Sequence, residues 1–436
     1  MRSFVLASVV ILLLGTARDS AAQDSNPAID ALRPFANGSS QRELIRAIGT
    51  LCFAGNRLSD RLQQDCNALV GGAFGSDSNV RGALAQIVAD NVNQTTDRTQ
   101  FVGTDLLLMQ VGVVSSRGPG GGGFLPAANG GVTAASEDFD AWSLHAAVDL
   151  RHRDRERSVN EDGFDSDHVG LLLGLDRRFT PQLNAGVAVG FGQGDVEFGG
   201  GSGDQDIDEH KLLLYANWSG DSGLYLDVLA SWQRRDIEQS RRVAYALAGG
   251  TGVDQRFSAN FDADATALAA TLGYHWQHGN MGLDGFINIE STSIEVDGYS
   301  ETASSADGNG AGWAIAVPDS DSDITTAELG WRASWSISGK RSVWLPQLEV
   351  AYVKVIDQDE SATAVQFLGD RSGSVGLSNL IFALSNDEED DDYFRLGAGL
   401  VAQWAEGRSG FINVSTHLGE SRYDATSLTL GARFEF

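Results

Sequence analysis

The histidines are the first residues to test for catalysis, because an imidazole base can activate a serine nucleophile held beside it. A His-x-Ser pair on one strand would put base and nucleophile on the same face. None of the seven histidines has a serine two positions later, and the Gly-x-Ser-x-Gly elbow of many hydrolases is also absent. We therefore expect no catalytic residues. The histidines lie at His145, His152, His168, His210, His275, His278 and His417.

The two cysteines, Cys52 and Cys66, are the next residues with possible chemistry. No histidine precedes His145, so a zinc site of the Cys/His type near them is disfavoured, and we expect no metal or cofactor. In an oxidising compartment a disulfide is the favoured state, and closing a loop of this size stabilises a fold by about 3 kcal/mol.

Two acidic runs could in principle hold calcium through carboxylate oxygens: "DSDSD" at 319–323 and "NDEEDDD" at 386–392. Neither has the turn glycine and closing glutamate of a calcium loop, so charge solvated by water is the favoured interpretation. The net charge of -28 excludes nucleic acid as an expected partner, because phosphate binding needs a basic face.

The amino-terminal segment 1–22 has the pattern of a secretory signal peptide. Arg2 supplies a positive start, residues 4–14 an apolar run, and Ser20 and Ala22 the small residues before a cleavage site. The apolar run is short for a membrane span. We expect a chain that is exported from the cytoplasm, where the disulfide can form.

The exported chain divides into three parts by the period of its apolar residues. Residues 23–115 carry apolar side chains at spacings of three and four, as in "SQRELIRAIGTLCFAG", which predicts a small helical region. Residues 116–140 are rich in glycine and predict a linker. From residue 141 to 436 the period is two, which predicts strands.

Twelve segments of this last part alternate between apolar and polar residues. In "AWSLHAAVDLR" the apolar face begins at Trp142 and the opposite face carries charge. The segments are longer than most strands of soluble sandwiches, and carboxylates and guanidinium groups on one face suit a water-filled lumen. They lie near 141–151, 167–178, 182–198, 208–218, 223–240, 257–278, 281–298, 321–338, 342–357, 392–405, 409–420 and 426–436.

The joints between these segments are short and long in turn. "TPQ", "SGDSG", "HGN", "SGKRS" and "EGRSG" are short, whereas stretches such as 237–256, 298–320 and 357–391 are long. This sorting is typical of a transmembrane barrel, and a soluble periplasmic sandwich has no reason to show it. Six tryptophans fall at the short-turn ends, where an interfacial girdle would lie: Trp142, Trp218, Trp276, Trp335, Trp344 and Trp404. We predict an all-β transmembrane barrel of twelve antiparallel strands with a small α-helical N-terminal region.

Residues 141–436 resemble the translocator domain of autotransporters, the type V secretion proteins of Gram-negative bacteria. The likeness rests on the twelve strands, on "WSLHAAVDLR" followed by "DHVGLLLGLDRRFTPQLNAGVAVGFGQGDVEF", and on the final "SLTLGARFEF". It implies an outer-membrane barrel that assists export or surface display of the segment before it. Residues 23–115 would be an unusually short passenger, and the preceding 116–140 is Gly-rich where the family threads a helix through the pore.

The resemblance also implies that Phe434 and Phe436 form the signal read by the outer-membrane barrel assembly machinery. Such a barrel would be surrounded by outer-membrane lipid and lipopolysaccharide. The basic clusters at 151–157 and 233–242 would either contact lipopolysaccharide phosphates or balance the charge of acidic loops. The period of two points six charged side chains into the lumen, where we predict that they form a network: Arg332, Arg395, Arg433, Glu328, Glu349 and Glu435. The alternative function is a porin-like channel or surface adhesin whose helical region stays in the periplasm. No feature of the sequence sets an oligomeric state.

Overall fold

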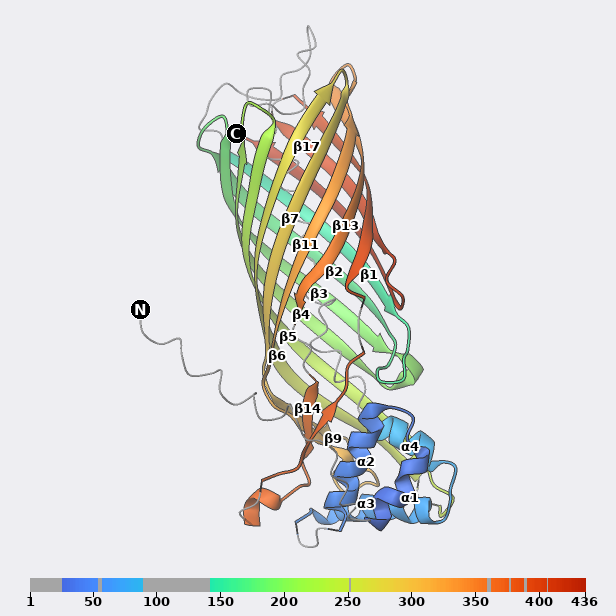
Figure 1. The fold of residues 1–436 in the computed structure, drawn as a ribbon. Helices are drawn as coiled ribbons and strands as arrows, with labels where there is room; N and C mark the ends of the chain where they lie inside the picture. The colour runs from blue at the N-terminus through green and yellow to red at the C-terminus, as the bar shows by residue number, and fades with distance from the viewer. Residues whose placement is uncertain are drawn as a thin grey trace, which may run out of the picture.

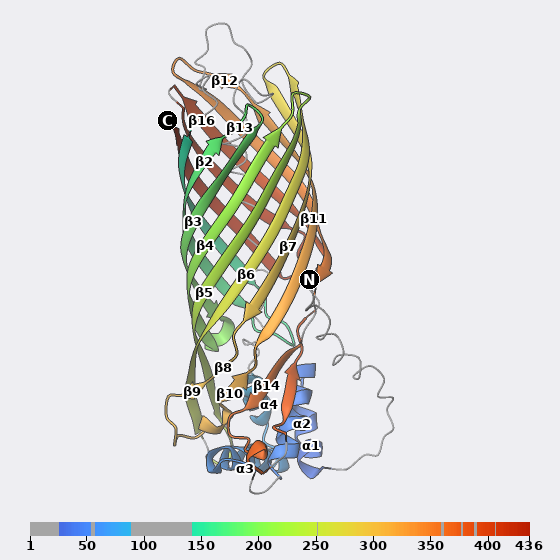
Figure 2. The ribbon, with the colours of Figure 1, turned by 90° about the vertical axis from the view of Figure 1, so that its left-hand side faces the viewer.

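The computed structural model describes residues 26–53, 57–88, 142–250, 252–358, 362–375, 378–387, 390–405 and 407–436. The predicted signal peptide at 1–22 and the predicted linker at 116–140 lie outside these residues, as does the predicted helical region beyond residue 88. Figures 1 and 2 show a tall barrel with a group of helices at one end, opposite the end at which the chain finishes.

The prediction of a closed antiparallel barrel of twelve strands is confirmed. Each long strand pairs with the next along the chain, and the last pairs with the first. The strands are β1 (Trp142–Arg155), β2 (Phe164–Arg178), β3 (Leu183–Phe198), β4 (Gly203–Ser219), β5 (Leu224–Ala246), β6 (Gly252–His278), β7 (Met281–Val296), β11 (Ser320–Trp335), β13 (Ser342–Gln358), β16 (Asp392–Trp404), β17 (Arg408–Leu418) and β18 (Tyr423–Glu435).

The wall of the barrel turns its apolar face outward. Along β1 the exposed Leu144 and Leu150 alternate with buried Asp149 and Arg151, as strand geometry requires for a period of two. Large apolar side chains remain uncovered on other strands too, as with Leu329 of β11 at 52% exposure. This pattern is the reverse of a water-soluble domain and fits lipid outside and polar groups inside.

One end of the barrel carries the short turns, and the other carries two long joints that fold into a second sheet. The joint after β7 contains β8 (Tyr299–Ser300), β9 (Thr302–Ala303), the 3-10 turn η5 (Ala311–Trp313) and β10 (Ile315–Val317). The joint after β13 contains β14 (Thr363–Phe367), η6 (Ser372–Val375) and β15 (Ile381–Leu384). Four of these strands pair in the order β15-β14-β10-β8. Three smaller elements lie elsewhere: η2 (Arg33–Phe35), η4 (Gly199–Gly201) and β12 (Ile337–Ser338).

The predicted loop at 237–256 is wrong. Strand β5 continues to Ala246 and β6 begins at Gly252, so the two form a hairpin that extends past the other strands toward the helices (Figure 2). The alternation persists through the polar stretch that suggested a loop, with Val243 and Phe257 buried between neighbours that are more exposed. Charged residues on the outward face of a strand outside the lipid are compatible with pairing, because they reach water.

The predicted helical region is confirmed over the described residues as α1 (Pro27–Leu32), α2 (Ser39–Leu51), α3 (Asp60–Phe74) and α4 (Val80–Ile87). Asn26 caps α1 and Ser59 caps α3, each accepting a hydrogen bond from a backbone N–H of the first turn. Within the described part of the chain, none of the helices has the length and apolar character needed to cross a membrane.

Candidate functional site

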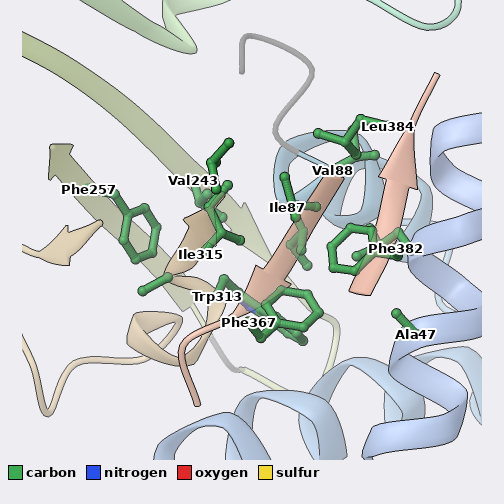
Figure 3. Close-up of a cluster of buried hydrophobic side chains, with 14 of the residues drawn as sticks. Ala47, Ile87, Val88, Val243, Phe257, Trp313, Ile315, Phe367, Phe382 and Leu384 are labelled. Atoms are coloured by element: carbon green, nitrogen blue, oxygen red, sulfur yellow. The ribbon is translucent and has the colours of Figure 1, made fainter. Parts of the chain in front are cut away.

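The helices pack against the long joints and the β5–β6 hairpin, and together these segments bury one hydrophobic core. We call this assembly the outer domain and its buried apolar residues the outer core (Figure 3). The helices contribute Ala28, Leu44, Ile48, Leu62, Leu69, Leu84 and Ile87. The barrel side contributes Val243, Phe257, Trp313, Ile315, Phe367, Phe382 and Leu384. The outer domain is therefore built from two parts of the chain that are more than 150 positions apart in sequence.

Asp65 links helix α3 to the turn η5 through buried hydrogen bonds. Its carboxylate is 2% exposed and accepts the backbone N–H groups of Gly310 and Gly312, each at 2.9 Å. The same carboxylate pairs with Arg61 at 2.9 Å, one turn earlier on α3. Because a buried carboxylate without partners would be strongly unfavourable, these contacts fix the position of the turn on the helix.

A short antiparallel bridge joins the chain just before α3 to the turn after β14. Leu58 lies opposite Asp370, the N–H of Ser59 donates to the carbonyl of Gly369 at 2.8 Å, and the N–H of Arg371 donates to Arg57 at 2.6 Å. The backbones of the helical region and the barrel thus contact each other directly, in addition to their side chains.

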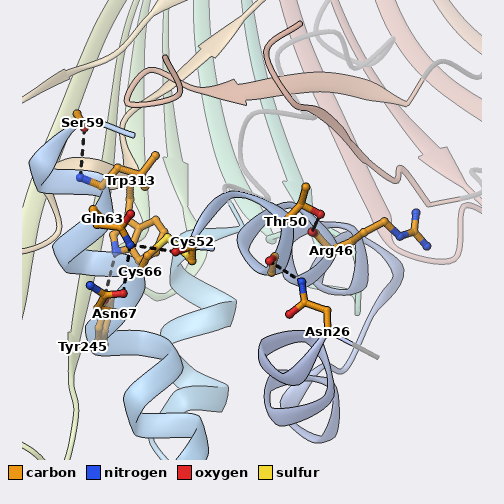
Figure 4. Close-up of a disulfide and its surroundings, with 12 residues drawn as sticks. Asn26, Arg46, Thr50, Cys52, Ser59, Gln63, Cys66, Asn67, Tyr245 and Trp313 are labelled. Atoms are coloured by element: carbon orange, nitrogen blue, oxygen red, sulfur yellow. Dashed lines mark hydrogen bonds between the residues drawn. A yellow bond between two sulfur atoms is a disulfide. The ribbon is translucent and has the colours of Figure 1, made fainter. Parts of the chain in front are cut away.

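The predicted disulfide between Cys52 and Cys66 is confirmed (Figure 4). It ties the end of α2 to the middle of α3, and both sulfur-bearing residues are buried in the outer core. The side chain of Gln63 donates to the carbonyl of Cys52 at 3.0 Å and reinforces the same junction.

Four of the six predicted lumen charges form a chain of ion pairs across three strands. Arg332 on β11 pairs with Glu349 on β13 at 2.7 Å. Arg395 on β16 bridges Glu349, at 3.3 Å, and Glu328. Arg395 is 1% exposed and Glu328 is 3% exposed, so the charges face inward as the strand period predicted.

The other two predicted lumen charges lie at the seam where β18 meets β1. Arg433 pairs with Asp176 at 2.8 Å, and Glu435 pairs with Arg178 at 3.0 Å. Asp176 also accepts a hydrogen bond from Tyr215 at 3.2 Å. The sequence reasoning did not name these partners, although their strands have the same alternation.

A further lumen cluster was also missed. Glu209 is buried beside Lys211 at 3.0 Å and Arg235 at 3.1 Å. His275 pairs with Asp284 at 3.0 Å on the neighbouring β6–β7 wall. The sequence signal for these residues is the alternation along β4, β5 and β6, which puts their charged side chains on the inward face.

The terminal aromatics lie on the outward face of the closing strand. Phe434, opposite Leu144 of β1, is 49% exposed, and Phe436 is 75% exposed. The backbone of Phe436 exchanges two hydrogen bonds with Trp142, at 2.8 and 3.1 Å. Five of the six predicted girdle tryptophans are exposed and Trp335 is half-buried.

Some members of the basic clusters are buried and others face outward. Arg151, Arg155, Arg235 and Arg241 are buried, and Arg241 makes a bidentate pair with Glu301 at 2.6 and 2.7 Å. Outward members also meet carboxylates, as Arg242 does with Asp254 at 2.9 Å. Of the two interpretations of these clusters, charge balance matches these pairs.

The acidic runs are engaged by backbone groups and arginines. Asp319 accepts the N–H of Gly298 at 2.7 Å. In the second run Asp387 accepts from Asn160 at 3.0 Å and pairs with Arg422 at 2.8 Å. Among the described residues, no group of three or more His, Cys, Asp or Glu side chains is arranged to hold a metal ion.

The protonation of Asp387 depends on the loops around it, which lie outside the barrel wall. We call these loops the rim. Burial on its own would raise the pKa of the carboxyl group. Hydrogen bonds from Ser158 and Asn160 and the charges of Arg422 and Arg155 outweigh burial and hold the pKa below its ordinary value. Asp387 therefore stabilises the contact between three outer loops as a carboxylate.

Residues 144–415, more than half of the chain, match the family model of the autotransporter β-domain. The chain belongs to the autotransporter family. It is an outer-membrane protein, and its barrel is the translocator domain.

Two solved autotransporter barrels are similar to this chain. The translocator domain of the autotransporter NalP from Neisseria meningitidis is 15% identical, covers 69% of this chain and 90% of its own, and superimposes with a TM-score of 0.50, a likeness of fold. The β-domain of the Bordetella autotransporter Brka is 18% identical, with coverages of 68% and 100% and a TM-score of 0.49.

An extracellular serine protease of Serratia marcescens is 26% identical over 175 residues. These residues are 40% of this chain and 15% of that protein, so the chain spans a small part of the length of the curated relative it matches.

Proposed function

We propose that this autotransporter carries its own helical region across the outer membrane and retains it on the cell surface, docked on the outer joints of the barrel. The outer core supports this proposal, because helices α1–α4 share it with the long joints, at the end of the barrel opposite the short turns. In outer-membrane barrels the long loops are extracellular and the short turns periplasmic. The protein would thus display a small domain.

The alternative, a channel or adhesin with a periplasmic helical region, requires those helices at the short-turn end. The described end of the helical region, Val88, is buried in the outer core. Trp142, where β1 begins, is bonded to Phe436 at the other end. These positions favour display over the alternative.

Labelling of intact cells with a membrane-impermeant amine reagent tests display. Residues 26–88 contain no lysine, and a Cβ at Gly82 on α4 meets nothing within 4 Å, so Gly82→Lys adds an exposed target without disturbing the fold. Lys340, exposed at the short-turn end, is the built-in control for the periplasmic side.

We expect the introduced lysine to react in intact cells, and Lys340 only after the outer membrane is permeabilised. Reaction of both only after permeabilisation would contradict display and favour the channel hypothesis. Reaction of both in intact cells would indicate a leaky membrane and is checked with a periplasmic marker protein.

We also infer that the assembly machinery recognises the outward aromatics Phe434 and Phe436, and that lipid and lipopolysaccharide surround the outer face. Exposed arginines of the basic clusters pair with carboxylates, as Arg234 does with Asp262, so contact with phosphates would be weak. We propose no catalytic activity for this chain, in keeping with the lack of a His-x-Ser pair in its sequence.

A further inference from the structure

The aromatic residues of the outer core come from the barrel side. Within 26–88 the aromatic residues are Phe35, Phe53 and Phe74, of which the last two are 60% and 58% exposed. Trp313 and Phe367, by contrast, are 0% and 1% exposed and pack against each other with ring centroids 5.6 Å apart. A chain of about 60 residues buries too little surface to be more than marginally stable on its own. The helical region therefore obtains the largest side chains of its core from the loops.

The start of helix α3 is framed by loop residues. Ser59, its N-cap, is held by the carbonyl of Gly369 and in turn accepts the N–H of Leu62 at 3.2 Å. One turn later Asp65 receives its two backbone donors from η5. Helix formation is limited by its first turn, and here a carbonyl of the barrel side holds the backbone of the N-cap residue of that turn.

Two glycines allow the backbones to approach this closely. A Cβ on Gly312 would lie 2.5 Å from the Cα of Leu62, and a Cβ on Gly369 would lie 2.6 Å from the Oγ of Ser59 and 2.7 Å from the Cβ of Leu62. The loop surface is therefore shaped to fit α3, and a single methyl group at either position would push the helix away.

Trp313 is held by side-chain hydrogen bonds that involve no residue of the helices. Its indole N–H donates to Tyr245 at 2.8 Å, and its carbonyl accepts from Arg241, whose guanidinium is fixed by Glu301. All four residues belong to the barrel side. The surface that receives the helices thus has its own internal support.

We propose that η5, β10, β14 and β15 form a folding template, on which the helical region acquires its structure after export. The proposal rests on the proposed function of display. In this scheme the region crosses the membrane without a complete core, and the loops supply the missing half once it emerges. The partner recognised by the loops is the chain's own segment 57–69.

The double variant Gly312→Val, Gly369→Val tests this in the full chain in the outer membrane, in the Gly82→Lys background. Gly249→Val is the matched control, since a Cβ there meets nothing within 4 Å. Three properties are measured on each chain: heat-modifiable migration for the barrel, surface labelling of the introduced lysine for export, and the rate of cleavage of residues 26–88 by external protease.

We expect a folded barrel and surface labelling in both variants, with cleavage about ten-fold faster in the double variant, because proteolysis follows the population of unfolded chain. Surface labelling lost in the double variant alone, with its barrel folded, also supports a template. Cleavage as slow as in Gly249→Val overturns the template, since the region then folds without the loops. Absence of surface labelling in the control chain would contradict display itself, which separates the two failures.

Discussion

The barrel wall and the outer domain bury opposite kinds of side chain. On the wall Leu268 is 59% exposed, whereas Arg395 is 1% exposed in the lumen. In the outer domain Leu69 is 0% exposed, and Arg42 and Arg46 face water. Leucine is thus exposed on the wall and buried in the outer domain, whereas arginine is buried in the lumen and exposed on the outer domain.

This reversal shows which solvent each region meets. A leucine on the wall gains nothing by turning inward, because lipid tails are as apolar as a protein core and the lumen is polar. In the outer domain water surrounds the surface, so burial of apolar area stabilises the fold at about 25 cal/mol per Å². The boundary between the two regimes runs across the β5–β6 hairpin, where the buried polar Gln239 and Arg241 lie between the buried apolar Ile237 and Val243.

Trp313→Ala sharpens this comparison most. It removes the largest side chain of the outer core, and we expect the outer domain to lose about 3–5 kcal/mol while the barrel is unaffected. Hydrogen exchange of the α3 amides measures the stability of the outer domain, and heat-modifiable migration on gels measures the stability of the barrel. Phe74→Ala, at an exposed position of the same helix, should change stability by less than about 0.5 kcal/mol. Equal effects of the two variants would contradict the assignment of Trp313 to a dry core.

Ile287→Arg tests the other side of the comparison. Ile287 lies on the outward face of β7 and is 52% exposed, so a charge there enters lipid and should destabilise the barrel by about 2–4 kcal/mol. Glu295→Arg, on the same face of the same strand beyond the apolar band, is the control and should be nearly neutral. Denaturant unfolding in lipid vesicles compares them. A neutral Ile287→Arg would mean that this face meets water.

How much of this could be read from the sequence depends on the range of the interaction. The strand period, the short turns and the charged inward face are local, and they predicted the barrel, its closure and the ion pairs around Glu349. The packing of Leu62 against Gly312 joins residues 250 positions apart, and no period in either segment points to the other. The stretch 237–256 is polar and predicts a loop by its local character, but the pairing of β5 with β6 extends through it.

The effect of pH on the rim of the outer domain should be smaller and confined to acid. The pKa of Asp387 is lowered in the folded protein, so its contribution is present above the ordinary carboxyl pKa and is lost as the pH falls below about 4. Hydrogen exchange at the amide of Glu156, which donates to Arg422 at 2.9 Å, reports the rim. We expect this amide to open in acid, and Asp387→Asn to remove most of that dependence. An acid response unchanged in Asp387→Asn would assign it to another group.

The most direct test of the account is a cross-link between the helical region and the barrel. Leu58 and Asp370 face each other in an antiparallel bridge flanked by two backbone hydrogen bonds, a pair whose Cα atoms lie about 4.5 Å apart and which suits a disulfide. Leu58→Cys with Asp370→Cys should give a reducible shift in gel mobility in membranes from intact cells, absent from either single variant. If both new thiols instead react freely with maleimide and no cross-link forms, the helices are not docked on the outer joints and the account is wrong.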